Sequence, residues 1–186
     1  MTAIEIVAAL ITLLSIWLAT RENVWYFPTG LVSLVMYTWI FIQARLYAEA
    51  GLQVVCMGLM LYGWYEWLFG GERHTELAVS RTPGWGWLVV LIGGTLLSLV
   101  TALLQKRYTD NPAPFIDSSL AGFSILTQLM TARKWVESWL LWIVINVTSV
   151  YLYITRELFV TAGLYFALLV LAVIGYRTWK RSLAFA

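Results

Sequence analysis

The sequence predicts an all-α membrane protein with seven transmembrane helices, and three observations lead to this fold class. Of its 186 residues, 61% are hydrophobic and only 12% are charged, whereas soluble domains carry about a quarter charged residues. The apolar residues form seven runs of roughly the 20 residues that cross a bilayer. An internal repeat relates the two ends of the chain. These features exclude a water-soluble globule and leave only short connectors outside the membrane.

The first half of the chain is predicted to hold three helices, each bounded by charged residues or glycine. Residues 2–20 form the first apolar run, which ends at Arg21. Residues 27–44 form the second, which ends at Arg45, and residues 48–69 form the third, which ends at a pair of glycines. The first run has no basic residue before it, so we expect a mature helix instead of a cleaved signal peptide.

Four more helices are predicted after the longest hydrophilic connector. Residues 85–104 form the fourth, which ends before Lys106 and a stretch rich in proline. Residues 115–132, 136–155 and 158–179 form the last three, and basic residues follow the final helix. All seven runs are long enough to span the hydrocarbon layer.

The internal repeat appears when the third and seventh helices are aligned at an offset of 112 positions. Unless the match is a chance coincidence, it predicts three helices in residues 1–84, a linker helix in 85–112 and three helices in 113–186. Equivalent helices then lie an even number of crossings apart, which is the parallel repeat plan of some transporters, with a site between the halves. The aligned segments and residues are 46–52 with 158–164, Arg21 with Arg133, Gly63 with Gly175, and Trp67 with Trp179.

Basic residues predict the orientation, because cytoplasmic connectors hold the excess of Lys and Arg. The face that carries the predicted N-terminus holds Arg45, Lys106, Arg107 and Arg156, and the opposite face holds the other eight of the 12 basic residues. We therefore expect the N-terminus outside and the C-terminus in the cytoplasm of a bacterial inner membrane. The net charge is only +2 and no basic run occurs, so a nucleic acid is not expected as a partner.

Enzyme and metal chemistry find no support in the residue types. The only histidine, His74, lies in a connector, and the only cysteine, Cys56, lies in an apolar run. A histidine-based metal site, a thiolate cluster and a Ser/His/Asp triad are therefore excluded, and we expect no cofactor. Acidic residues fall near helix ends, which argues against a buried proton relay and favours a facilitator over an ion-driven pump.

One face of the sixth helix is predicted as a binding surface. Trp139, Trp142 and Asn146 lie at positions i, i+3 and i+7, and Ser149 and Tyr153 continue the stripe. An amide near the middle of a span needs a partner, so Asn146 either ties two helices together or binds a ligand. The spacing alone leaves both readings open.

Other helices offer weaker candidates of the same kind. Gln53 begins a row on the third helix that ends in Trp64 and Trp67, and Gln128 lies in the fifth helix. The two tryptophans favour an interfacial aromatic belt, while Gln53 fits a helix contact and a ligand contact equally. A lining so rich in aromatic rings suits flat, cationic ligands.

The sequence resembles the PnuC family of bacterial vitamin transporters along most of its length. The family motif Trp-x-x-Trp-x-x-x-Asn/Asp is complete as Trp139, Trp142 and Asn146, and the stretches at 114–118 and 131–134 match as well. The resemblance implies a full-length SWEET-like fold. It also implies uptake of nicotinamide riboside by facilitated diffusion, with a cytoplasmic kinase that phosphorylates and traps the substrate.

The resemblance also implies roles for particular residues. Trp139 and Trp142 would flank the pyridinium ring, Asn146, Gln53 and Gln128 would bond the amide or the ribose hydroxyls, and Tyr165 would line the site. Thiamine and riboflavin, which relatives carry, remain alternative substrates. Two alternatives belong to other functional classes, namely a structural membrane subunit without a ligand and a membrane-embedded enzyme. The lipid bilayer is an expected partner, and a homo-oligomer is a further expectation.

Overall fold

The computed structural model describes residues 3–43, 47–108 and 114–185, and within them it contains seven long helices and no strand. The prediction of an all-helical fold with seven helices is confirmed. The fourth long helix is continuous from Gly84 to Tyr108 and is made of α4, a π-helical segment and α5. The elements are α1 (Ala3–Thr20), α2 (Tyr26–Gln43), α3 (Tyr47–Phe69), the short 3-10 turn Glu72–His74, α4 (Gly84–Leu88), the π segment Val89–Gly93, α5 (Gly94–Tyr108), α6 (Pro114–Ala132), α7 (Ser138–Thr155) and α8 (Phe159–Phe185).

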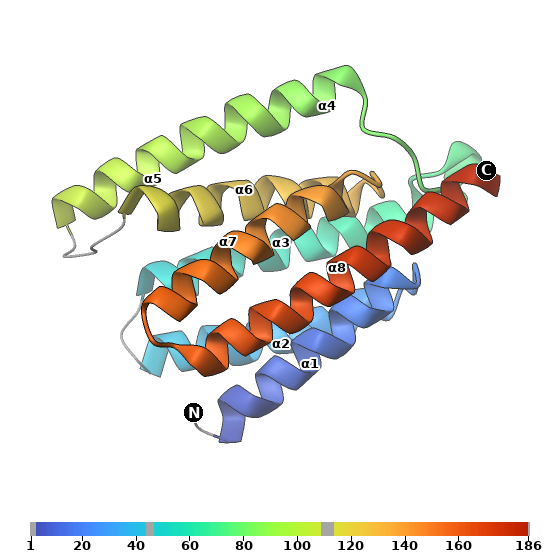
Figure 1. Ribbon diagram of the computed structural model, residues 1–186. Helices are drawn as coiled ribbons and strands as arrows, with labels where there is room; N and C mark the ends of the chain where they lie inside the picture. The colour runs from blue at the N-terminus through green and yellow to red at the C-terminus, as the bar shows by residue number, and fades with distance from the viewer. Residues whose placement is uncertain (1–2, 44–46, 109–113, 186) are drawn as a thin grey trace.

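The helices form an elongated bundle with the two chain ends at opposite ends of it (Figure 1). α1, α2 and α3 pack in sequence, and so do α6, α7 and α8. The two groups meet where α1 packs against α8 and where α3 packs against α6. The helix α4–α5 lies along the outer edge of the bundle and packs against α6.

Three helix boundaries differ from those predicted. α5 continues through Lys106 and ends at Tyr108, because basic residues in the last turn favour a helix C-terminus instead of breaking it. α7 begins at Ser138, since the preceding Val136 donates its backbone N–H to Ser80 O at 3.0 Å. α8 continues past Trp179 to Phe185, so the basic tail is helical.

Three helices end in turns of the same type, in each of which a residue other than glycine adopts positive φ. Glu22 after α1 has φ 56°, Lys134 after α6 has φ 51° and Glu157 after α7 has φ 58°. In each turn the backbone N–H of this residue bonds the carbonyl three positions earlier, and the next N–H bonds the carbonyl five positions before it. This is the Schellman arrangement, which satisfies carbonyls left open at a helix end.

An aromatic core fills the bundle at the end where α1 and α6 terminate. Phe27 and Trp67 pack edge to face with ring centroids 4.9 Å apart, and Trp139 and Trp179 do so at 5.3 Å. A Cβ at Gly63 would lie 2.8 Å from Phe27, and a Cβ at Gly175 would lie 2.6 Å from the Trp139 ring. Both helices therefore need glycine where an aromatic ring crosses them.

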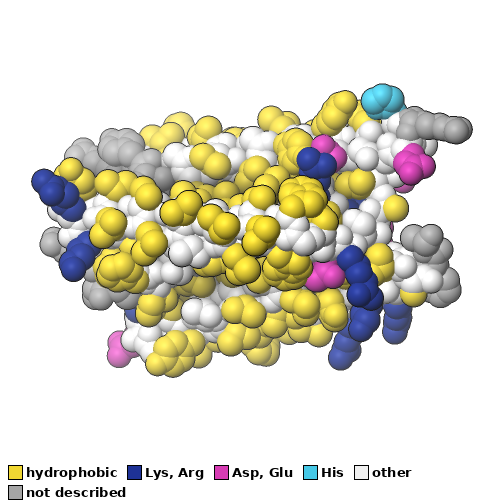
Figure 2. All heavy atoms as spheres, turned by 90° about the horizontal axis from the view of Figure 1, so that it is seen from above, with side chains coloured by type: hydrophobic (Ala, Val, Ile, Leu, Met, Phe, Trp, Pro, Cys, Tyr) yellow, Lys and Arg dark blue, Asp and Glu magenta, His cyan; other side chains and the backbone are white. Residues whose placement is uncertain are grey.

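The outer surface of the bundle is apolar along most of its length. In Figure 2 the hydrophobic side chains cover the middle of the molecule, and Lys and Arg gather toward the ends. By length and composition alone, three described helices could each cross a membrane, namely Gly84–Tyr108, Ser138–Thr155 and Phe159–Ala184. An exposed apolar belt between charged ends is typical of a chain that lies in a bilayer.

Candidate binding site

α7 turns its polar stripe toward the interior of the bundle. Asn146 is 4% exposed and Ser149 is 2% exposed, while Trp142 is half-buried. Within the described part of the chain, no residue hydrogen-bonds the side-chain amide of Asn146. Burying an amide in this way costs about 1–3 kcal/mol unless a partner meets it. Asn146 therefore offers open hydrogen-bonding groups inside the bundle.

Gln128 joins three helices at one point. Its side-chain Nε2 on α6 lies 2.8 Å from the hydroxyl oxygen of Tyr26 on α2 and 3.1 Å from the sulfur of Met60 on α3. Tyr26 is 2% exposed and Met60 is 4% exposed. The structure thus places Gln128 where the two groups of three helices meet.

Trp142 approaches the same face of α6. Its indole Nε1 donates to the hydroxyl of Thr131 at 3.1 Å, and Thr131 lies one helical turn after Gln128. Gln128 and Trp142 are therefore brought together by α6. Asn146 follows Trp142 by one turn of α7, so these three predicted site residues belong to one region of the interior.

The structure places Trp139 in the aromatic core. Its ring is 2% exposed and packs edge to face on Trp179. The indole Nε1 of Trp139 is buried and has no hydrogen-bond partner among the described residues. The motif therefore divides between two environments: Trp139 contacts α8, and Trp142 contacts α6.

Gln53 and Tyr165 lie farther along the bundle. Gln53 is half-buried on α3, about two helical turns before Met60 and so about 10 Å from it along the axis. Tyr165 on α8 stacks on Tyr153 of α7, with ring centroids 5.1 Å apart. Tyr153 lies about two turns beyond Asn146 on α7. Asn146 therefore lies between Trp142 on one side and the pair of Tyr153 and Tyr165 on the other.

Two residues of this region, Tyr26 and Thr131, were not predicted as site residues from the sequence. Tyr26 is the first residue of α2, a position where an aromatic residue is also typical of the membrane interface. Nothing in the spacing within α2 or α6 indicates that Tyr26 reaches Gln128. The aligned repeat gives no signal either, because Ser138 occupies the position equivalent to Tyr26.

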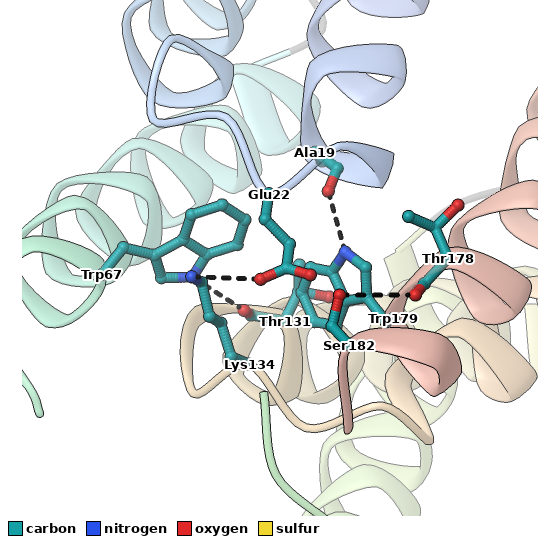
Figure 3. Close-up of polar contacts among 8 residues, drawn as sticks. All are labelled: Ala19, Glu22, Trp67, Thr131, Lys134, Thr178, Trp179 and Ser182. Carbon is teal, nitrogen blue, oxygen red and sulfur yellow. Dashed lines mark hydrogen bonds and ion pairs between the residues drawn. The ribbon is translucent and has the colours of Figure 1, made fainter. Parts of the chain in front are cut away.

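An ion pair closes one end of the interior (Figure 3). Nζ of Lys134 lies 3.6 Å from a carboxylate oxygen of Glu22 and 4.6 Å from the centre of the Trp67 ring. Burial lowers the pKa of Lys134, and the Glu22 carboxylate offsets part of that shift. Because Glu22 follows α1 and Lys134 follows α6, this pair joins the two groups of three helices.

Two hollows on the described surface lie away from these residues. One runs between α6 and α7 and is lined by apolar side chains such as Phe115 and Val144, and the other runs between α1 and α8 beside Trp17. Neither contains a predicted site residue. Within the described ranges, no group of three or more His, Cys, Asp or Glu side chains could hold a metal ion.

Comparisons with known proteins extend over almost the whole chain. A family model described as nicotinamide mononucleotide transporter matches residues 2–181. The nicotinamide riboside transporter PnuC of Escherichia coli is 29% identical, and the match covers 96% of this chain and 85% of that protein. The riboflavin/roseoflavin transporter RibM of Streptomyces davaonensis is 27% identical, with 94% and 83% covered.

The fold also resembles a solved structure. A crystal structure of the vitamin B3 transporter PnuC matches with a TM-score of 0.74 at 21% identity, covering 96% of this chain and 80% of that one. The helical arrangement is therefore shared with that protein.

Proposed function

The chain belongs to the nicotinamide mononucleotide transporter family, so it is a membrane transporter and not an enzyme, and we propose that it imports nicotinamide riboside. The relatives named for this substrate support the choice. The charge of the site supports a nucleoside over a nucleotide. Gln128, Trp142 and Asn146 are uncharged, and a buried phosphate would need cationic partners to offset its desolvation.

The open amide of Asn146 is the observation that carries the proposal. A carboxamide or a ribose hydroxyl can hydrogen-bond both the N–H donor and the carbonyl acceptor of the Asn146 amide, which removes the cost of burying these two groups. Trp142, one turn away, offers an aromatic face to the pyridinium cation. The stacked pair Tyr153 and Tyr165 offers a second aromatic surface beyond Asn146. We therefore expect the substrate to bind around Asn146.

A parallel repeat is part of the proposal, with three helices in residues 1–84, a linker helix in 85–112 and three helices in 113–186, as in SWEET-like transporters. Contacts between equivalent positions support it. The Trp67 indole donates to Thr131 O at 3.1 Å and the Trp179 indole donates to Ala19 O at 3.0 Å. Both donors and both acceptors are 112 positions apart, so the two bonds exchange under the repeat.

Transport by facilitated diffusion is proposed because three described acidic groups, Glu22, Glu66 and Asp117, pair with bases near helix ends. Asp117, in the first turn of α6, lies 3.0 Å from Arg156, and Glu66, near the end of α3, lies 3.7 Å from Arg133. These positions suit anchoring of helix ends more than a proton path. Phosphorylation by a cytoplasmic kinase would then retain the substrate.

The bacterial inner membrane, with an outside N-terminus and a cytoplasmic C-terminus, completes the proposal. Among the described residues, Lys and Arg gather toward the two ends of the molecule (Figure 2), where the connectors of a membrane protein are expected, while Arg45 lies outside the described residues. Association of copies of the chain in the membrane is a further expectation, and light scattering of the detergent complex measures it.

Titration calorimetry of the purified protein in detergent tests the substrate. We expect micromolar or tighter binding of nicotinamide riboside, with weaker binding of thiamine and riboflavin. Riboflavin is the second candidate because a riboflavin transporter is among the relatives, and thiamine remains open as a flat cation. The proposal is contradicted if folded protein gives no binding signal with nicotinamide riboside.

A further inference from the structure

The Gln128 side chain is held by two acceptors of different kinds. Its Nε2 lies 2.8 Å from the Tyr26 hydroxyl and 3.1 Å from the Met60 sulfur. An amide nitrogen carries two protons, so these two contacts can engage both. All three side chains come from different helices of the bundle.

Met60 decides which way the Gln128 amide points. A tyrosine hydroxyl donates as well as accepts, so Tyr26 alone would tolerate either the nitrogen or the oxygen of the amide. A thioether sulfur has no proton and can only accept. If the amide were turned over, Oε1 would face that sulfur without a hydrogen bond. The thioether therefore favours the orientation in which Nε2 faces Tyr26 and Met60.

The carbonyl oxygen of Gln128 is left as its open group. No described residue donates to Oε1 of Gln128, and the side chain is half-buried. Thr131, one turn further along α6, holds the edge of the Trp142 indole. Gln128 thus presents an acceptor next to the aromatic ring on which we expect the pyridinium to rest. A carboxamide on that ring lies in the ring plane and can direct its N–H at such an acceptor.

Gly30 on α2 gives Met60 the space to reach Gln128. A methyl group at this position would overlap the terminal methyl of Met60 and would come within 2.9 Å of the Ser15 hydroxyl. The Met60 side chain is flexible and would move first. The contact between sulfur and amide therefore depends on a glycine in a third helix.

We propose that Met60 is a positioning residue that sets substrate specificity, because its sulfur holds Gln128 with the carbonyl toward the substrate. The site then selects a ligand that donates a hydrogen bond from its ring substituent. A carboxamide fulfils this condition, and a carboxylate in the same place would face the Gln128 oxygen with its own oxygens. The inference rests on the proposed function.

Binding of two matched ligands tests the inference. Nicotinamide riboside and nicotinic acid riboside share the pyridinium and the ribose and differ in carboxamide against carboxylate. Calorimetry of the unaltered protein should show about 10- to 100-fold tighter binding of the amide, the range expected when a buried acceptor loses its donor. In Met60→Leu the amide of Gln128 can turn over, and the ratio should fall to within about threefold.

Met57→Leu is the control, since Met57 lies about one turn earlier on the same helix and the change in side chain is identical. It should keep the full ratio. Gly30→Ala is a second variant that retains the thioether but displaces it, and it should narrow the ratio as Met60→Leu does. The inference is overturned if the ratio of the two affinities is unchanged in both variants, including the case in which both affinities fall by the same factor. Absence of binding of nicotinamide riboside to the unaltered protein overturns the proposed function instead.

Discussion

Trp67 and Trp179 lie against each other at the end of the bundle where α1 and α6 terminate, with ring centroids 5.7 Å apart. Each indole donates to a backbone carbonyl at the end of a helix in the other group of three, Trp67 to Thr131 and Trp179 to Ala19. Both side chains are almost completely buried, at 1% and 0% exposed. Two tryptophans 112 positions apart thus make the same kind of hydrogen bond to the opposite group of helices.

Loss of either indole N–H should destabilise the protein to a similar extent. Trp67→Phe and Trp179→Phe each leave a buried carbonyl without its donor and remove part of a packed ring, which costs about 2–3 kcal/mol. Thermal unfolding in detergent measures the effect. Trp25→Phe is the matched control, since Trp25 is 67% exposed, and its melting temperature should be unchanged. A large loss in only one of the two core variants would contradict equivalent roles.

Replacement of Asn146 by leucine should abolish binding of nicotinamide riboside while the protein stays folded. Leucine has nearly the same size and shape but neither donates nor accepts a hydrogen bond, so the ligand would lose at least two bonds. The affinity should fall by about 100-fold or more. Thr148→Val on the same helix is the control, because the Thr148 hydroxyl bonds only Val144 O of its own helix. Unchanged affinity in Asn146→Leu would refute the assignment.

Trp142 should contribute through its aromatic face. Trp142→Leu removes the ring and should weaken binding of the pyridinium by about 10- to 30-fold, the range of a desolvated cation–π contact. Trp142→Phe keeps a ring and loses the N–H that bonds Thr131, so the loss should be several-fold smaller. Calorimetry of both variants distinguishes the roles. Equal losses would show that the N–H matters and the face does not.

Removal of one partner of the Glu22–Lys134 pair should destabilise the protein more than removal of both. Glu22→Gln leaves Lys134, whose side chain is 7% exposed, with only the weaker attraction of Glu76, so the loss should approach the cost of a buried charge without a partner, about 3 kcal/mol. The double variant Glu22→Gln with Lys134→Met removes both charges and should recover most of this loss. Melting temperatures of the four proteins give the coupling. A double variant less stable than Glu22→Gln contradicts the account.

The pH dependence of stability should carry the signature of Lys134. Burial lowers its pKa below the ordinary value of 10.5, so the folded protein releases this proton at a lower pH than the unfolded chain. Stability then rises with pH between the two pKa values, because the unfolded state binds more protons there. As the pH rises toward 10.5, the unaltered protein should therefore gain stability relative to Lys134→Met. A relative loss would show the opposite shift.

The helices could be predicted from the sequence because each apolar run is long and bounded by charge. The errors lie at helix ends, and one of these ends is decided by a distant contact. The start of α7 depends on Ser80, which bonds the backbone around Trp135, and no local pattern at residues 136–138 reports that contact. α5 and α8 run through their basic residues to Tyr108 and Phe185, because Lys and Arg have a helix propensity close to that of leucine.

The site could be predicted only in part, for a related reason. The inward stripe of α7 follows from helical spacing, and Asn146 is buried as that spacing indicates. The partners of Gln128 lie on other helices, and helical periodicity does not align one helix with another. The repeat carried one signal that was missed: one position after the aligned Arg21 and Arg133 come Glu22 and Lys134, whose opposite charges can pair.

Uptake into proteoliposomes tests the central claim most directly. Purified protein is reconstituted without any ion gradient, and radiolabelled nicotinamide riboside is added outside. The account predicts that the label enters faster than into empty liposomes, stops when the inner and outer concentrations are equal, and does not enter with Asn146→Leu. Entry no faster than into empty liposomes, by protein that is shown to be folded, would contradict the claim that this chain carries nicotinamide riboside.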